Sequence, residues 1–153
     1  MISADMITMT PAAPLWKKWN GREWIVAEAW ICRIKTDKFE FTLKIYPGFK
    51  TDGGSIPAAF QNIISPLGVY LLAFLIHDAL YASECCTRAE ADWILLELCE
   101  WLGAGYFRRN EIYLAVRAGG CFVWKNHTRK SVAAARKMIE FSPISGFKQL
   151  TTA

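Results

Sequence analysis

His77 and Asp78 are the residues of this sequence best placed to do chemistry, because they interrupt an apolar stretch, residues 68–76. Burying an ionisable pair is costly unless each group finds a partner. Consecutive helical residues point about 100° apart, so these two side chains cannot simply bond each other, whereas Tyr81 lies one turn after His77 on the same face. Each group must therefore look to another element for its partner. A histidine held in this way can serve as a general base or a metal ligand.

Two nearby segments offer partners for this pair. The segment TRAEAD, residues 87–92, supplies Arg88 and Asp92, which lie one turn apart, and we expect Asp92 to be half buried at the border of an apolar stripe. The segment TDGGSIP, residues 51–57, has two glycines that allow positive φ and a close approach of the backbone to a ligand. Its candidates are Thr51, Asp52, Gly53, Gly54 and Ser55.

Two interpretations of these residues stay open. In the functional one, His77, Asp78 and Asp52 are catalytic, and Asp78 and Asp92 hold a divalent metal. An anionic ligand would then be bound by a second set: Thr51, Gly53, Gly54, Ser55, Tyr81, Arg88 and Arg117. In the structural interpretation, Asp52, His77 and Asp92 form a buried polar network that holds the loop to the helices.

Several established catalytic motifs are absent: the chain has no GxSxG elbow, no Walker loop and no HExxH pair. Metal phosphohydrolases of the HD type need another histidine upstream of the His–Asp pair. This chain has none, because its second histidine, His127, follows the pair. The HDxxY spacing locally resembles secreted phospholipases A2, in which the His is the base and the Asp binds calcium. Those enzymes depend on a disulfide framework and on a glycine-rich calcium loop directly before the helix, and this chain has neither in the required arrangement. As an enzyme, the chain would be a His-dependent, metal-assisted hydrolase, and the sequence leaves open whether it is one.

The elements that must position these residues can be predicted from hydrophobic periodicity. Residues 24–34 and 39–46 predict a β-hairpin, the first strand covered on both faces and the second half buried. Helices are predicted over 67–83, 87–103 and 106–126, with a weaker one over 129–141, and Thr87 with Glu90 fits a capping box. The fold class is therefore α+β, a small antiparallel sheet packed on a bundle of three to four helices. One globular domain, 15–141, is expected between a flexible arm, 1–14, and a tail, 142–153.

Composition narrows the class of protein further. Hydrophobic residues make up 53% of the chain and charged ones 21%, as in ordinary globular domains. The apolar run at 68–76 is too short to span a membrane, which needs about 20 residues, and the first residues do not resemble a secretory signal. The five cysteines form no CxxC pair and are expected to stay reduced inside a cell.

Charge is unevenly distributed along the chain. Residues 1–103 contain nine Lys and Arg against twelve Asp and Glu, whereas residues 104–153 contain nine against two. A basic C-terminal third favours anionic partners. No basic cluster is dense enough to predict a nucleic acid as a specific partner.

The order of the segments TDGGSIP, HDALY and TRAEAD, followed by Tyr113, Val116, Arg117 and Gly120, resembles a phage and prophage family catalogued as domain of unknown function 1353. The resemblance covers roughly residues 22–126, and Gly54 stands where the family usually has Ala. It implies a viral or prophage origin, and with it a protein of the host cytoplasm or the virion. It supplies no activity. The signature positions that it marks are Asp52, Ser55, His77, Asp78, Tyr81, Arg88 and Asp92.

The leading hypothesis is a phage accessory protein with a polar pocket between residues 50–57 and the first two helices. The pocket would bind, and in an enzyme hydrolyse, an anionic nucleotide-like or phosphorylated small ligand such as a host defence signal. One alternative is a non-catalytic ligand sponge, or a virion-assembly or host-protein-binding module with Trp16, Trp19 and Trp24 at its interface. A third is a cell-wall hydrolase acting in entry or lysis.

Overall fold

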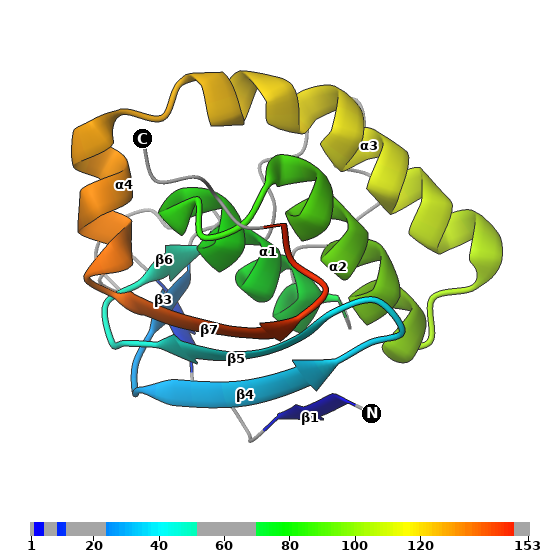
Figure 1. Ribbon diagram of the computed structural model, residues 1–153, viewed down its shortest axis with the longest axis horizontal. Helices are drawn as coiled ribbons and strands as arrows, with labels where there is room; N and C mark the ends of the chain where they lie inside the picture. The colour runs from blue at the N-terminus through cyan, green and yellow to red at the C-terminus, as the bar shows by residue number, and fades with distance from the viewer. Residues whose placement is uncertain (1, 5–8, 12–23, 52–69, 149–153) are drawn as a thin grey trace.

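The computed structural model describes residues 2–4, 9–11, 24–51 and 70–148 of the chain. Helices α1 (Leu71–Ser83) and α2 (Arg88–Trp101) lie beside the larger sheet, and α3 (Tyr106–Lys125) and α4 (Arg129–Arg136) run around the outside of these two helices (Figure 1). The expected α+β class, an antiparallel sheet packed on a small group of helices, is confirmed.

The strands of the described residues form two antiparallel sheets. The larger has the order β1-β4-β5-β7 and the smaller the order β2-β3-β6. The larger sheet consists of β1 (Ile2–Ala4), β4 (Trp30–Lys35), β5 (Glu40–Ile45) and β7 (Ile139–Ser145). The smaller consists of β2 (Met9–Pro11), β3 (Trp24–Val26) and β6 (Lys50–Thr51).

One face of the larger sheet forms part of the core. Burial alternates along β4 and β5, so that Phe41 is buried and Ile31 is exposed. The half-buried strand expected at 39–46 is therefore confirmed. The expectation that residues 24–34 form one strand covered on both faces is wrong, because residues 27–29 separate β3 from β4 and the outer face of β4 is exposed.

The C-terminal part departs from the predicted helix over 129–141. Helix α4 ends at Arg136, and β7 then pairs with β5 in a register that places Ile139 opposite Ile45 and Phe141 opposite Leu43. The pairing is favoured because it buries Ile139 and brings the ring of Phe141 to 5.4 Å from that of Phe41. Strand β7 thus crosses residue 141, where we placed the end of the domain, and β1 and β2 lie within the segment expected to be a flexible arm.

The short connection of residues 84–87 brings α2 back beside α1 and sets the geometry of the site. The expected capping box is confirmed: the Thr87 hydroxyl accepts from the Glu90 backbone N–H, and the Glu90 carboxylate accepts from the Thr87 backbone N–H. Of the apolar stripe expected on this helix, Ala91, Ile94, Leu95 and Leu98 are buried, whereas Leu102 is half-buried and follows the end of α2. None of the helices described is long and apolar enough to cross a membrane.

Candidate functional site

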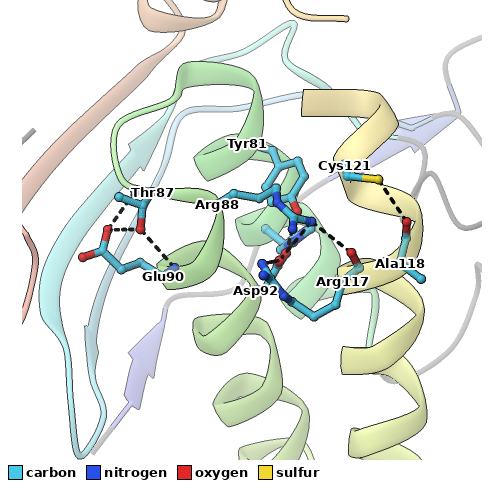
Figure 2. Close-up of polar contacts among 9 residues, drawn as sticks. Tyr81, Thr87, Arg88, Glu90, Asp92, Arg117, Ala118 and Cys121 are labelled. Carbon is cyan, nitrogen blue, oxygen red and sulfur yellow. Dashed lines mark hydrogen bonds and ion pairs between the residues drawn. The ribbon is translucent and has the colours of Figure 1, made fainter. Parts of the chain in front are cut away.

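Asp92 is the centre of the candidate site, and it is fully buried rather than half buried as expected. Its Oδ1 lies 2.9 Å from Nε2 of His77 and accepts a hydrogen bond of 2.6 Å from the Tyr81 hydroxyl. Its Oδ2 accepts a hydrogen bond of 2.6 Å from Nη1 of Arg117, and Nη1 of Arg88 lies 3.7 Å away. Figure 2 shows Tyr81, Arg88 and Arg117 meeting at this carboxylate. Burial of Asp92 is tolerated because donors from three helices compensate its charge.

The position of Tyr81 depends on close packing between α1 and α3. Its ring lies 4.2 Å from that of His77 and meets Trp124 edge-on at 5.1 Å. A Cβ atom at Gly120 would lie only 2.5 Å from the Tyr81 hydroxyl oxygen. Only glycine at this position leaves room for the hydroxyl, so Gly120 allows α3 to pack closely against Tyr81 of α1.

Arg88 and Arg117 form the outer, positively charged side of the network. Nη1 of Arg88 donates to the backbone carbonyl of Arg117 at 3.1 Å, which holds the start of α2 against α3. The side chains of Arg88 and Arg117 are 23% and 33% exposed, whereas Asp92 is sealed from solvent. The contacts with Asp92 and with the carbonyl use only Nη1 of each guanidinium.

Asp78 joins this network to the start of the glycine-containing segment. The Thr51 hydroxyl donates a short hydrogen bond to Oδ2 of Asp78, and Oδ1 of Asp78 lies 3.9 Å from Nδ1 of His77. The structure therefore brings together six of the expected site residues around two carboxylates. Thr51 and His77 lie at Asp78, and His77, Tyr81, Arg88 and Arg117 lie at Asp92. The expected site residues Asp52, Gly53, Gly54 and Ser55 lie outside the described residues, so their roles and the pocket beside them stay predictions.

The electrostatics of the network favour the charged forms of His77 and Asp92 and the neutral form of Tyr81. Burial on its own lowers the pKa of His77, but Asp78 and Asp92 outweigh it and the pKa is raised. Burial on its own raises the pKa of Asp92, but hydrogen bonds from His77, Tyr81 and Arg117 outweigh it and the pKa is lowered. Burial, and then the hydrogen bond to Asp92, raises the pKa of Tyr81, which stays a neutral donor.

The expected metal site can be assessed for the described residues only. Among them, no group of three or more His, Cys, Asp or Glu side chains could hold a metal ion. A cation at Asp92 would have to displace His77, Tyr81 or Arg117. Asp78 is partly exposed and faces another oxygen donor, Thr51, so it is the better of the two expected metal ligands.

Cys85, in the connection between α1 and α2, lines a separate cavity of about 370 Å³ beside β7. A hydrogen bond from Cys86 lowers the pKa of the Cys85 thiol despite its burial. Burial raises the pKa of Cys32 and of Cys99 to about 12. The five cysteines are all free, as expected. Cys85 is thus more acidic than the two core thiols.

The fold and the site define an α+β protein in which three helices meet at a buried carboxylate bound by histidine, tyrosine and arginine. Residues 24–116 match the family described as "Protein of unknown function (DUF1353)", and the chain belongs to this family, as its segments predicted. No curated protein and no solved structure is detectably similar to the chain. The family match spans Thr51 to Asp92, whereas Arg117 and Gly120 lie beyond it.

Proposed function

We propose that this chain is a phage-encoded hydrolase that uses His77 as a general base to cleave an ester bond in an anionic, phosphate-bearing small ligand. The observation that carries the proposal is the 2.9 Å contact between Nε2 of His77 and the buried Asp92, which leaves Nδ1 directed toward Asp78. The phage origin, the host cytoplasm as location and a host defence signal as ligand belong to this proposal and rest on the resemblance of the signature segments.

The histidine is held in the tautomer that a base requires. Asp92 accepts a hydrogen bond from the Nε2–H group, so the neutral ring carries its lone pair on Nδ1. Nδ1 can then take a proton from a water molecule as the water attacks the ester, while Asp92 stabilises the imidazolium that forms. The same proton passes to the departing alcohol, so that one water yields one acid and one alcohol.

In this proposal Asp78 contributes one oxygen ligand to a divalent metal ion next to this base, since the described residues offer no group of three or more such ligands. Its carboxylate is partly exposed and lies beside the Thr51 hydroxyl, and calcium and magnesium prefer oxygen donors of this kind. When bound, such an ion would polarise the ester and stabilise the negative charge that develops on it.

Arg88 and Arg117 supply the anion-binding part of the site. Each guanidinium keeps donors that Asp92 does not use, and each is partly exposed. Planar guanidinium groups of this kind bind phosphate through two parallel hydrogen bonds. The basic C-terminal third would raise the local concentration of the same ligands.

A non-catalytic ligand sponge is the second candidate, and the near-complete burial of His77 favours it. A sponge would use the two arginines in the same way but would have no need of a base. The two candidates therefore agree on the ligand class and differ only in the role of His77.

The test is hydrolysis of a panel of nucleoside phosphoesters, cyclic dinucleotides and glycerophosphoesters in isotopically labelled water, followed by mass spectrometry. The variant is His77→Gln, whose amide nitrogen can still donate to Asp92 but which has no basic Nδ1. The control is His127→Gln, because His127 lies outside the network and contacts Glu84 at 2.9 Å. We expect His77→Gln alone to lose incorporation of the label while remaining folded at the temperature of the assay. Hydrolysis by His77→Gln at the wild-type rate would contradict the proposal, and ligand binding without turnover would indicate a sponge.

A further inference from the structure

Two adjacent thiols in the connection between α1 and α2 lie beside a cavity. Cys85 lines the cavity of about 370 Å³ beside β7, a volume within the range of about 300–1,000 Å³ that small-molecule sites occupy. Cys86 is buried, and its thiol donates a hydrogen bond to the sulfur of Cys85. The part of β7 that lines the cavity, Pro143 to Ser145, is exposed, so a small molecule can enter from solvent.

A fixed turn after β7 forms one wall of this cavity. Gly146 has a φ of +89°, and a Cβ atom there would collide with the backbone oxygen of Lys38, so the turn requires glycine. Phe147 is then partly buried against the core, and the backbone N–H of Lys148 donates to the Glu90 carboxylate at 2.8 Å. The end of β7 is therefore held to the start of α2, and the cavity is part of the fold.

Two basic side chains give the cavity a positive charge. Lys148 is exposed and lines it. The guanidinium of Arg136 donates to the backbone carbonyls of the two residues before Cys85, at 2.8 and 3.2 Å, and these acceptors are neutral. Of the nearby carboxylates, that of Glu84 already lies 2.9 Å from Nδ1 of His127. An anionic ligand is therefore favoured over a cationic one.

The two thiols differ in how readily they ionise. The hydrogen bond from Cys86, with a smaller contribution from Arg136, lowers the pKa of Cys85 despite its burial. The hydrogen bond to Cys85, burial and the charge of Glu90 raise the pKa of Cys86. Because the thiolate is the nucleophile in thiol–disulfide exchange, Cys85 can attack a disulfide, whereas the protonated Cys86 does not displace the group that becomes attached.

We propose that Cys85 is a modification site for a small anionic disulfide, represented by glutathione disulfide, one half of which becomes attached to the Cys85 sulfur and occupies the cavity. The Cys85 thiol loses its proton to solvent, and the thiolate attacks one sulfur of the disulfide. A bond forms between these two sulfurs as the disulfide bond of the small molecule breaks. The other half leaves as a thiolate and takes a proton from solvent, so the Cys85 sulfur is oxidised and the departing sulfur is reduced. The carboxylates of the attached half then face Lys148 and Arg136.

This modification goes beyond the proposed hydrolysis and does not depend on it. Neither His77 nor Asp78 takes part in the exchange. The His77→Gln variant is therefore expected to be modified as the wild type is, and loss of hydrolysis would leave this inference untouched.

The test is incubation of the full chain with glutathione disulfide, followed by peptide mass spectrometry. Cys121 is the internal control, because it is also partly exposed and lies on α3, where its thiol donates to the Ala118 carbonyl at 3.2 Å (Figure 2). Cystamine, a disulfide with a positive charge at each end, is the comparison reagent. The variant is Lys148→Gln, and the matched control is Lys130→Gln, which removes the same charge from α4 and leaves the lining of the cavity unchanged.

We expect one glutathionyl group per chain, on Cys85, formed at least ~10-fold faster than on Cys121. Relative to Cys121, Cys85 should prefer glutathione disulfide over cystamine by about 5-fold, as for an exposed ion pair. Lys148→Gln should reduce this preference, whereas Lys130→Gln should keep it.

Three results would overturn the proposal. The first is absence of the group from Cys85, or its faster attachment to Cys121. The second is an equal preference for the two reagents, or a preference that Lys148→Gln leaves unchanged. The third is a disulfide between Cys85 and Cys86, seen as the loss of two hydrogen atoms without an attached group, because the proposal requires Cys86 to stay protonated.

Discussion

Replacing Asp92 by asparagine tests how strongly the network depends on one buried charge. The side chain keeps its size, but one oxygen becomes an amide that can no longer accept from Arg117 while the other serves His77 and Tyr81. Arg117 and a protonated His77 are then left without the carboxylate that compensates them.

The expected cost follows from the burial of Asp92. Removing one partner of a buried ion pair costs about 3–5 kcal/mol, because the remaining charges stay desolvated. Asp92 is fully buried and its contacts come from α1 and α3, so the loss should approach that range. The control is Glu100→Gln on the same helix, since Glu100 pairs with Arg109 at the surface, where such a change costs about 0–1 kcal/mol.

The assay is unfolding by denaturant followed by far-UV circular dichroism, with the slope of the transition checked for each variant. A free energy of unfolding within about 1 kcal/mol of wild type for Asp92→Asn would refute the reasoning. If Asp92→Asn does not fold, Tyr81→Phe removes one of the three direct donors and should cost about 1–3 kcal/mol.

Three further predictions concern single residues. The pKa of His77 is raised on folding, so its protonated form stabilises the fold fully below pH 6.5, and this contribution is lost as the pH rises through the pKa of the folded protein. The free energy of unfolding, measured against pH, should lose this dependence in His77→Gln. Gly120→Ala should destabilise by about 1–3 kcal/mol and by less in a Tyr81→Phe background, whereas equal losses in both would exclude a clash with the hydroxyl. Cys85, with its lowered pKa, should react with iodoacetamide faster than Cys32, as peptide mass spectrometry can measure; equal rates would contradict this.

Much of the helical framework could be predicted because its signals are local. Three of these signals are the capping box at Thr87 and Glu90, the apolar stripe of α2 and the alternation of β5. Each of them depends on residues that lie within a few positions of one another in the sequence. Strand β7 could not be predicted in this way. Its place depends on pairing with β5, about a hundred residues earlier in the chain, and Pro143 weakens the local signal for a strand.

The site was predicted as a set of residues but not as a geometry. The HDxxY and RxxAD spacings identified His77, Tyr81 and Asp92 because each spacing lies on one helix face. The full burial of Asp92 depends on Arg117, which α3 supplies from 25 residues further along. Gly120 lies where α3 packs closely on Tyr81, and a side chain there would meet the Tyr81 hydroxyl.

The central claim is that His77 accepts a proton from water during hydrolysis, and the pH dependence of turnover tests it most directly. For a phosphate-bearing ester from the panel, the wild-type rate should rise as the pH passes the raised pKa of His77 and then level off. His77→Gln should lose at least ~100-fold in rate and show no such rise. A His77→Gln variant that keeps the wild-type rate and pH profile would contradict the account, as would a wild type that hydrolyses no member of the panel.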